Sequence, residues 1–390
     1  MNVALLIPEL GGGGAQRVAQ ILGDHLVQKG ENVYYFLGDN SIKQVYPVKG
    51  KIVKTNIKSC IYENNRKADM HNIMLLLESS LQMRKLKHKY KIDVAISFME
   101  QFNYINILSK GKEKVFARVC TILSFREDFD GILFRKDLVR LLYSKADKVI
   151  VMSDYGMRDM CKYYGVPGKK LVKIPNAVTD RDMEEVASPW EFGDMAVISV
   201  GRLEDVKQHD RIIRAFSYVV QKEQRAKLLI LGEGSRRGYL KNLSEKYGIE
   251  DSVKFIGFTD KVSYYLRNSK AFVMASKVEG FPNSMIEAMN YGLPVIATDS
   301  RGGCSEVIGH KEKDQAGFQL CEYGIFTPSM PKEKVRVNSP LSRQELILGD
   351  AILSVLTDCE IYDEYKQRSF KRADMFHVDK VMKKWERLIL

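Results

Sequence analysis

Short apolar runs alternate with segments of helical periodicity along this whole 390-residue chain, and the alternation starts twice. We expect strands in the front half at 3–7, 33–37, 94–98, 115–119 and 149–152, and in the back half at 196–201, 227–232, 253–258, 271–275 and 294–298. Apolar strands separated by helices are the signature of parallel βαβ units. The sequence therefore predicts an α/β protein made of two doubly wound, Rossmann-like domains.

The alternation is interrupted between residues 171 and 194, where two prolines stand among acidic and small residues. We place the boundary there, with residues 1–178 as the first domain and residues 179–375 as the second. Residues 376–390 carry an apolar stripe at helical spacing, so this C-terminal helix must pack on another part of the protein. Residues 328–340 hold three prolines without periodicity and are expected to form a mobile surface loop.

Charge is distributed unevenly along the chain, whose formal net charge is +12. Residues 1–180 hold 29 Lys and Arg against 18 Asp and Glu, whereas residues 181–390 hold 32 against 31. A basic domain indicates an anionic partner, for which a membrane surface and nucleic acid are the usual candidates. Lysines that only keep the surface soluble are the alternative.

Composition also bounds the cellular setting. No apolar run reaches the roughly 18 to 20 residues that a spanning helix needs, and the first residues, MNVALLIPEL, lack a basic leader or a cleavage site. The six cysteines are scattered without a CxxC pair, so neither a zinc ribbon nor a disulfide framework is indicated. We therefore expect a cytoplasmic protein with reduced thiols.

The segment EGFPNSMIEAMNYGLPVIATD places Glu279 and Glu287 across a loop and the start of a helix. Asn283 or Ser284 is expected to cap this helix, and Gly292 to end it. Glu279 would then lie at the carboxyl edge of the sheet, where open α/β folds bind ligands. Amides at the helix start suit an anion, and the flanking carboxylates suit hydroxyl groups, which together describe a nucleotide sugar. Two solvated glutamates are the alternative.

Two cations follow the first strand of the back half, in GRLEDVKQ. Arg202 and Lys207 would project from the same edge as Glu279 and neutralise a diphosphate leaving group, although pairing with nearby carboxylates is an equal alternative. A glycine loop, GGGGAQRV at 11–18, follows the first strand of the front half. It permits close approach of a phosphate or sugar, but it is neither a clean GxGxxG nor a P-loop.

These segments resemble the GT-B glycosyltransferases, in particular the large retaining family 4, many of whose bacterial members build capsule, exopolysaccharide and lipopolysaccharide. The similarity covers nearly the whole chain and rests, in the family's order, on GGGGAQRV, SFMEQFN, IPNAV, SVGRLEDVKQ, LGEGSRRGYL, VKFIGF and EGFPNSMIEAM. It implies two Rossmann-like domains that face each other across a cleft. Residues 1–178 would bind the acceptor, residues 179–375 the nucleotide sugar, and residues 376–390 would cross back to the first domain.

The resemblance also implies roles for single residues. Arg202 and Lys207 match the pair that holds the donor diphosphate and stabilises its departure, and Glu279 matches the carboxylate that contacts the transferred sugar. These three are the expected catalytic residues, and Glu287 matches the carboxylate that binds the ribose hydroxyls. The other donor-binding positions that it implies are Gly13, Gly14, Gly201, Phe255, Ile256, Gly257, Gly280, Phe281, Pro282 and Asn283.

The chain departs from the family pattern on the acceptor side. Gln16 stands where glutamate is common, and SFRED at 124–128 replaces a differently composed strand end. Asn103, Arg126 and Glu127 are the candidate acceptor residues. Retaining enzymes of this type resemble a front-face substitution, in which the leaving diphosphate helps to deprotonate the incoming hydroxyl. No protein nucleophile, cofactor or metal is expected, and Asp-Phe-Asp at 128–130 is expected to be an ordinary loop.

Basic residues follow apolar ones in two expected helices, 70–91 and 131–148, which fits an acceptor carried on a lipid in an anionic bilayer. Core packing of the apolar faces is the alternative. Nucleic-acid binding is the rival from another class, but the chain has no helix-turn-helix, zinc or RNP-type motif. A GT-B nucleotide-sugar epimerase is the nearer alternative, and it demands a carboxylate and histidine set that the six histidines do not display.

The sequence thus leads to one principal prediction. The protein is expected to be a retaining glycosyltransferase that moves a hexose or N-acetylhexosamine from a UDP-sugar to a saccharide acceptor, lipid-linked, in cell-surface polysaccharide synthesis. It is expected to lie peripherally on the inner face of the plasma membrane, without a nucleic-acid partner.

Overall fold

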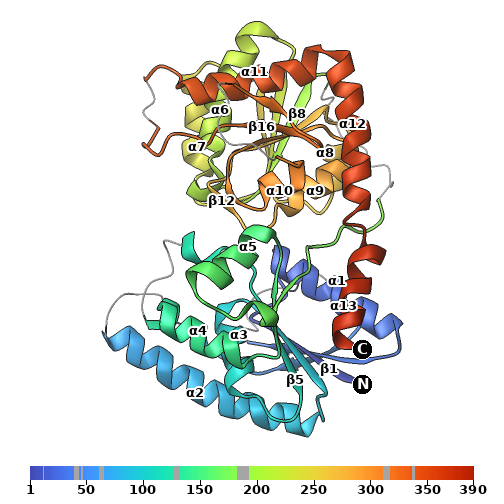
Figure 1. Cartoon of the computed structure of the whole chain (residues 1–390). Helices are drawn as coiled ribbons and strands as arrows, with labels where there is room; N and C mark the ends of the chain where they lie inside the picture. The colour runs from blue at the N-terminus through green and yellow to red at the C-terminus, as the bar shows by residue number, and fades with distance from the viewer. Residues whose placement is uncertain are drawn as a thin grey trace. The chain divides into compact units, whose positions relative to one another are not determined.

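The chain forms two compact units, described separately below. The computed structural model describes residues 1–11, 13–38, 44, 47–60, 66–125, 132–181, 193–310, 317–335 and 339–390. Unit 1 comprises Met1–Ala177 with Asp379–Leu390, and unit 2 comprises Val178–Val378 (Figure 1). The sequence placed the first boundary between 178 and 179 and the second at 376. The chain passes between the units at 177–178 and again at 378–379.

Unit 1 is built on a seven-stranded sheet of order β3-β2-β1-β4-β5-β6-β7, all parallel. Its strands are β1 (Asn2–Ile7), β2 (Asn32–Leu37), β3 (Lys51–Lys54), β4 (Val94–Phe98), β5 (Lys114–Arg118), β6 (Lys148–Val151) and β7 (Leu171–Lys173). The central strands are buried on both faces, which is why they read as continuous apolar runs rather than as alternating ones.

Helices connect these strands. The longer ones are α1 (Gly14–Gln28), α2 (Arg66–Lys89), α3 (Glu100–Leu108), α4 (Lys136–Lys145) and α13 (Val378–Ile389). Shorter helical turns are η1 (Leu123–Phe125), η2 (Ile132–Phe134), α5 (Asp154–Arg158), the π-helical turn η3 (Asp159–Tyr163) and η4 (Gly168–Lys170). None of the helices in the described residues is both long enough and apolar enough to cross a membrane.

Unit 2 repeats the same plan, with strand order β10-β9-β8-β11-β13-β16-β15. Its strands are β8 (Ala196–Val200), β9 (Lys227–Leu231), β10 (Val253–Gly257), β11 (Ala271–Met274), β13 (Val295–Thr298), β16 (Ile325–Thr327) and the antiparallel β15 (Gln319–Leu320), with a separate pair β12 (Val278–Glu279) and β14 (Arg301–Gly302). Its helices are η5 (Asp205–Lys207), α6 (His209–Lys222), α7 (Arg237–Lys246), α8 (Val262–Arg267), α9 (Asn283–Asn290), α10 (Cys304–Ile308), α11 (Arg343–Thr357) and α12 (Cys359–Asp374).

All ten strands expected from the sequence are confirmed to within a residue at each end. The sequence missed the short strands, and it assigned 171–173 to the linker between domains although these residues form β7 of unit 1. The missed strands have two to four residues, and they either contain only two or three residues or, like β3, carry a charge at each end, so they show no apolar run.

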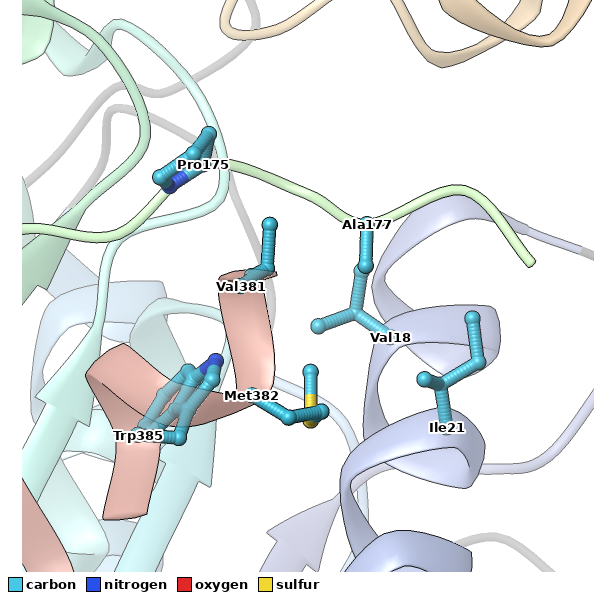
Figure 2. Close-up of a pocket in the computed structure, with 7 residues that line it drawn as sticks. All are labelled: Val18, Ile21, Pro175, Ala177, Val381, Met382 and Trp385. Atoms are coloured by element: carbon cyan, nitrogen blue, oxygen red, sulfur yellow. The ribbon is translucent and has the colours of Figure 1, made fainter. Parts of the chain in front are cut away.

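The helix α13 packs within unit 1, where Val381, Met382 and Trp385 meet Val18 and Ile21 of α1 and the segment at Pro175 and Ala177 (Figure 2). These seven residues line a small apolar hollow.

Beneath Trp385 lies Arg118 at the end of β5, fully buried with its guanidinium 5.4 Å from the ring centroid. Arg118 also donates to Asn176 of the segment IPNAV. Residues 174–178 therefore help to seat α13.

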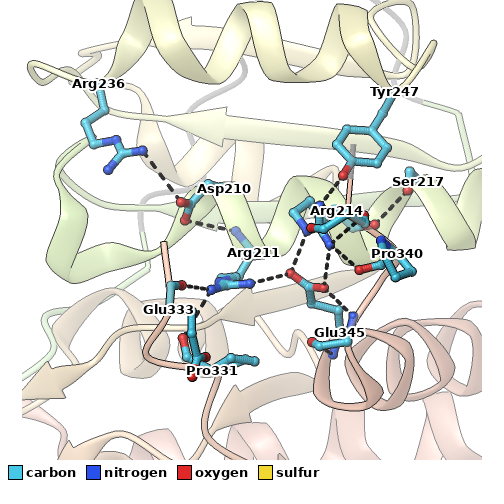
Figure 3. A network of polar contacts seen from close by, with 12 residues as sticks. Asp210, Arg211, Arg214, Ser217, Arg236, Tyr247, Pro331, Glu333, Pro340 and Glu345 are labelled. Carbon is cyan, nitrogen blue, oxygen red and sulfur yellow. Dashed lines mark hydrogen bonds and ion pairs between the residues drawn. The ribbon is translucent and has the colours of Figure 1, made fainter. Parts of the chain in front are cut away.

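A buried ion cluster joins two helices of unit 2 (Figure 3). Glu345, which caps α11 together with Ser342, accepts hydrogen bonds from Arg211 at 2.9 Å and Arg214 at 2.8 Å, both on α6. Arg211 also donates to the carbonyls of Pro331 and Glu333. The described residues 328–335 and 339–340 form a loop, as expected, and this arginine holds part of it to α6; the mobility of the loop stays a prediction.

The variant Glu345→Gln should destabilise unit 2 by about 3 to 5 kcal/mol at neutral pH, because it leaves two buried guanidinium groups without their carboxylate. Burial raises the pKa of Glu345, but hydrogen bonds from Arg214, the Ser342 amide and Arg211 outweigh it, so the pKa lies below its ordinary value of 4.5. A depressed folded-state pKa means that this stabilisation is present above 4.5 and is lost as the pH falls through the lower, folded value.

Urea unfolding of Glu345→Gln and of the parent, followed by circular dichroism at about pH 7 and about pH 3, measures both effects. The two proteins should differ most at the higher pH, and the difference should shrink at the lower one. Glu360→Gln, an exposed glutamate in the first turn of α12, is the control and should match the parent throughout. Equal stability of Glu345→Gln and parent at neutral pH would contradict this account.

Candidate active site

The order of the strands in unit 2 fixes where a ligand site can form. The strand β8 lies between β9 and β11, so the connections from β8 and β11 leave the sheet in opposite directions. Open α/β sheets bind ligands at this switch point, outside the carboxyl ends of the strands. The two loops that leave there are 201–207 and 275–279. The amide of Lys277 donates to the carbonyl of Val206 at 2.8 Å and joins them.

The central contact of this edge is an ion pair. Lys207, the last residue of η5, donates from Nζ to Oε1 of Glu279, the last residue of β12. The two side chains are 20% and 11% exposed, so the pair is shielded but still reachable. Glu204 and Asp205 are the nearby carboxylates with which Lys207 could have paired instead. In the structure Glu204 instead accepts from Ser235, at 3.0 Å from its amide and 2.8 Å from its hydroxyl, and Asp205 pairs with Arg236.

Arg202 follows Gly201 at the end of β8, and its side chain is exposed. Within the described parts of the chain it forms no salt bridge, so its charge faces solvent at the same edge of the sheet as Lys207. The edge therefore presents two cations and one carboxylate, in the combination that the sequence predicted for a diphosphate and a hydroxyl-bearing ring.

Glycines let the loops of this edge approach each other. Gly302 has φ +136, and a side-chain carbon there would overlap the carbonyl oxygen of Glu279. The register of β12 with β14 sets Glu279 opposite Gly302, and the Gly303 amide donates to the Glu279 carbonyl at 2.8 Å. Gly232, with φ +132, stands against the carbonyl of Gly201 in the same way. The backbone of Glu279 is thus held by a partner that only glycine permits.

The helix α9 carries Glu287 in its second turn, and Glu287 is half-buried. The predicted cap is wrong, because the helix begins at Asn283 with Pro282 in the capping position and no side chain caps it. The amides at this helix start are therefore not satisfied by a side-chain cap. The ring of Phe281 is buried against Phe376 with centroids 5.4 Å apart, so only the backbone of Phe281 remains for a ligand. The predicted end of the helix at Gly292, with φ +78, is confirmed.

The strand β10 is the edge strand of the sheet, and its pairing with β9 skips Ile256. Such a bulge turns one residue out of the ladder. The carbonyl of Gly257 accepts from the Gly232 amide at 2.8 Å, and that of Phe255 accepts from Arg237 at 3.3 Å. Phe255, Ile256 and Gly257 are among the predicted donor-binding positions, and Ile256 is the one that the bulge frees from strand pairing.

The predicted glycine loop belongs to unit 1. Gly13 precedes α1 in an extended conformation and Gly14 is the first residue of that helix. Glu9 accepts hydrogen bonds from the amide of Gly11 and from the side chain of Gln16, which folds over Gly13. A glutamate at position 16, as is common in the family, would place two carboxylates together here. Glutamine at position 16 avoids this repulsion and donates a hydrogen bond to Glu9 instead.

Of the three candidate acceptor residues, the structure describes only Asn103. Asn103 on α3 is fully buried and bonds internally to the Ser97 hydroxyl at 2.8 Å, the Arg118 carbonyl at 2.9 Å and the Tyr143 hydroxyl at 3.0 Å. It holds α3 to the sheet. Arg126 and Glu127 lie outside the described residues, as does Asp-Phe-Asp at 128–130.

Sequence reasoning missed two features of the site. Gly302 was overlooked because nothing in RGG at 301–303 shows which backbone it must admit. His209, two residues after Lys207, is buried at the start of α6, and burial together with the charge of Lys207 lowers its pKa to about 3. This imidazole is neutral at working pH. It does not provide the protonated histidine that an epimerase could use as an acid.

Comparisons with known proteins identify the family of each unit and the relatives of the chain. The family model described as glycosyl transferases group 1 matches residues 180–320, and the model described as glycosyltransferase family 4 matches residues 12–181. A relative from Campylobacter jejuni, N-acetylgalactosamine-N,N'-diacetylbacillosaminyl-diphospho-undecaprenol 4-alpha-N-acetylgalactosaminyltransferase, is 28% identical over 80% of this chain and 84% of its own length.

Two solved structures share the fold from end to end. Sucrose-phosphate synthase from Thermosynechococcus elongatus superposes with a TM-score of 0.77 at 18% identity, covering 99% of this chain and 98% of its own. The HepE protein of Anabaena, in complex with UDP and glucose, gives a TM-score of 0.72 at 15% identity and covers 99% and 98%. With a glycosyltransferase family 4 domain at residues 12–181, a glycosyl transferases group 1 domain at residues 180–320 and this fold shared along its length, the chain is a glycosyltransferase of the GT-B fold.

Proposed function

We propose that this enzyme transfers a hexose or N-acetylhexosamine from a UDP-sugar to a lipid-linked saccharide, with retention of the anomeric configuration. The observation that carries the proposal is the Lys207–Glu279 pair at the switch point of the unit 2 sheet, beside exposed Arg202. A cation next to a carboxylate suits a ligand in which a diphosphate adjoins a polyhydroxylated ring.

The donor would be held by groups of distinct chemistry. Arg202 and Lys207 neutralise the diphosphate, and the amides of 280–283 at the start of α9 add hydrogen bonds to it and to the sugar. Glu279 accepts hydrogen bonds from sugar hydroxyls, and Glu287 accepts them from the ribose. Ile256 at the bulge of β10 contacts the base. Before the donor arrives, Glu279 keeps the Lys207 ammonium oriented at this edge, so little reorganisation is needed on binding.

The reaction would proceed on one face of the sugar. The bond from the anomeric carbon to the diphosphate oxygen breaks while the bond to the acceptor oxygen forms, and the acceptor proton passes to the departing diphosphate. The negative charge that develops on the diphosphate is stabilised by Arg202 and Lys207. These fixed cations do the work that a divalent metal does elsewhere, so we propose that the enzyme needs neither a metal nor another cofactor.

The acceptor class is proposed from a relative and from charge. The Campylobacter jejuni relative is named for an acceptor built on diphospho-undecaprenol. The basic front half of this chain, with 29 Lys and Arg against 18 Asp and Glu over residues 1–180, suits an acceptor held at an anionic membrane. We accordingly place the enzyme peripherally on the cytoplasmic face of the plasma membrane.

Donor use is the direct test. The purified enzyme should release UDP from a UDP-hexose or a UDP-N-acetylhexosamine in the presence of a lipid-linked acceptor, with and without EDTA. NMR of the product should show the donor's anomeric configuration. Turnover of GDP-sugars alone, inversion at the anomeric carbon, or loss of activity in EDTA would each refute the corresponding part of the proposal.

Arg202→Ala, Lys207→Ala and Glu279→Ala should each lower kcat by about 10²- to 10³-fold, the usual effect of removing one group that stabilises transition-state charge or positions the reacting sugar. The measurement is initial rate of UDP release, with circular dichroism to verify that each variant is folded. Lys222→Ala, an exposed lysine at the end of α6, is the matched control and should keep the parental rate. Parental activity in any of the three variants would count heavily against this donor site.

Gly302→Ala tests the support of Glu279 without touching a charged group. The added methyl group must displace the Glu279 carbonyl, and a misplaced sugar contact should lower kcat by about 10- to 100-fold. Gly238→Ala is the matched control, because a methyl group there meets nothing within 4 Å. If Gly302→Ala folds and turns over normally, the tight β12–β14 contact does not position Glu279.

A further inference from the structure

The helix α2 of unit 1 carries apolar side chains on both its buried and its outward face. Its buried face packs Leu76 and Met83 into the core of unit 1 and also holds the polar residues Asn72, Ser79, Ser80 and Lys87. Lys87 is satisfied there by Glu113 at 2.8 Å and the Asn106 carbonyl at 3.0 Å. Its outward face holds large apolar side chains with the exposures Met70 57%, Ile73 38%, Met74 59%, Leu77 55% and Leu81 65%.

These five residues form one continuous stripe, which we call the α2 stripe. Their spacings of three and four residues place them on a single face of the helix, over a length of about 16 Å at 1.5 Å per residue. Other exposed large apolar side chains of the described chain, such as Leu141, Phe258 and Leu320, occur singly on different elements. Single exposed apolar residues need no explanation, but a contiguous stripe marks an interaction surface.

Charge at the ends of the stripe identifies the partner. Arg84, Lys85 and His88 lie three, four and seven residues after Leu81 and so continue the same face, and Lys67 stands three residues before Met70; all four are exposed. Glu78 is the exposed acid at the margin. An apolar band with basic side chains at both ends matches the acyl and headgroup layers of an anionic leaflet, where long basic side chains reach outward to phosphate.

A neighbouring helix carries the same signature more weakly. The helices α2 and α4 both contact α3, and in Figure 1 they lie near each other in unit 1. Exposed Leu141 of α4 stands between Arg140 and Lys145, which are also exposed. Because the residues of the α2 stripe are exposed, the alternative of core packing for the helix at 70–91 does not hold for this face of α2.

We propose that the α2 stripe inserts into the outer layer of an anionic phospholipid leaflet and is the surface by which the enzyme lies on its membrane. The helix would rest in the plane of the interface, with Met70, Met74, Leu77 and Leu81 among the acyl chains. This inference deepens the proposed function, on which it rests for the lipid-linked acceptor. It assigns membrane contact to one helix face rather than to the basic charge of the whole unit.

Flotation of the full-length protein with vesicles of phosphatidylcholine and phosphatidylglycerol tests the proposal. The triple variant Met74→Gln, Leu77→Gln, Leu81→Gln should bind about tenfold less than the parent, because three apolar side chains no longer leave water. The matched control is Leu320→Gln, Leu346→Gln, Met375→Gln, which removes three exposed apolar side chains from unit 2 and should bind as the parent does. A second variant, Arg84→Gln with Lys85→Gln, should lose the preference for phosphatidylglycerol and the salt dependence of binding.

Two results would overturn the proposal. One is parental vesicle binding by the α2 triple variant. The other is a dimeric parent that becomes monomeric in the triple variant with vesicle binding unchanged, which would identify the stripe as a contact between copies of the chain. Flotation uses no sugar substrate, and UDP release with a water-soluble acceptor should stay within about twofold in every variant because α2 holds no donor residue. Failure of the membrane proposal and failure of the transferase proposal are therefore separable.

Discussion

The ion pair between Lys207 and Glu279 ties together what the rest of unit 2 arranges. The two residues are far apart in sequence and come from the loops after β8 and β11, the strands on either side of the switch point. The hydrogen bond from the Lys277 amide to the Val206 carbonyl and the glycine contact of β14 hold the two loops in place. Opposite charges set this way before a ligand arrives suit a molecule that carries both anionic and hydroxyl groups, as the proposed donor does.

Stability and chemistry are separated in this unit. The cluster of Arg211, Arg214 and Glu345 is almost wholly buried and binds α6 to α11 and to the backbone carbonyls of Pro331, Glu333, Ser339 and Pro340. The pair of Lys207 and Glu279 begins only a few residues earlier along the chain but remains reachable. Residues close together in the sequence thus lie in different places. Lys207 of η5 stays at the edge of the sheet, whereas Arg211 and Arg214 of α6 are buried inside unit 2.

Much of the fold could be predicted from the sequence, because strands buried on both faces appear as unbroken apolar runs and each was followed by a helix. The edge strands β3, β7 and β15 could not. KIVK of β3 is charged at both ends, and LVK of β7 is too short to show a pattern. In the site, Arg202, Lys207 and Glu279 were found from the loops that hold them. Which acid Lys207 meets, and why Gly302 is needed, depend on backbones that approach only in three dimensions. The same limit applies to α2. The periodicity of its sequence shows that apolar residues share a face of the helix, but it does not show which face packs on the sheet.

The placement of α13 has a consequence for how the protein is made. Trp385 covers Arg118 and completes the interior of unit 1. Along the sequence, however, residues 178–378 of unit 2 separate α13 from the rest of unit 1. During synthesis the front portion emerges from the ribosome first and waits, with the surface around Arg118 and Val18 bare, until all of unit 2 has been translated. The enzyme therefore cannot mature one half after the other. Unit 1 is therefore completed last, and the surface around Arg118 and Val18 is the part of the nascent chain that a chaperone would meet.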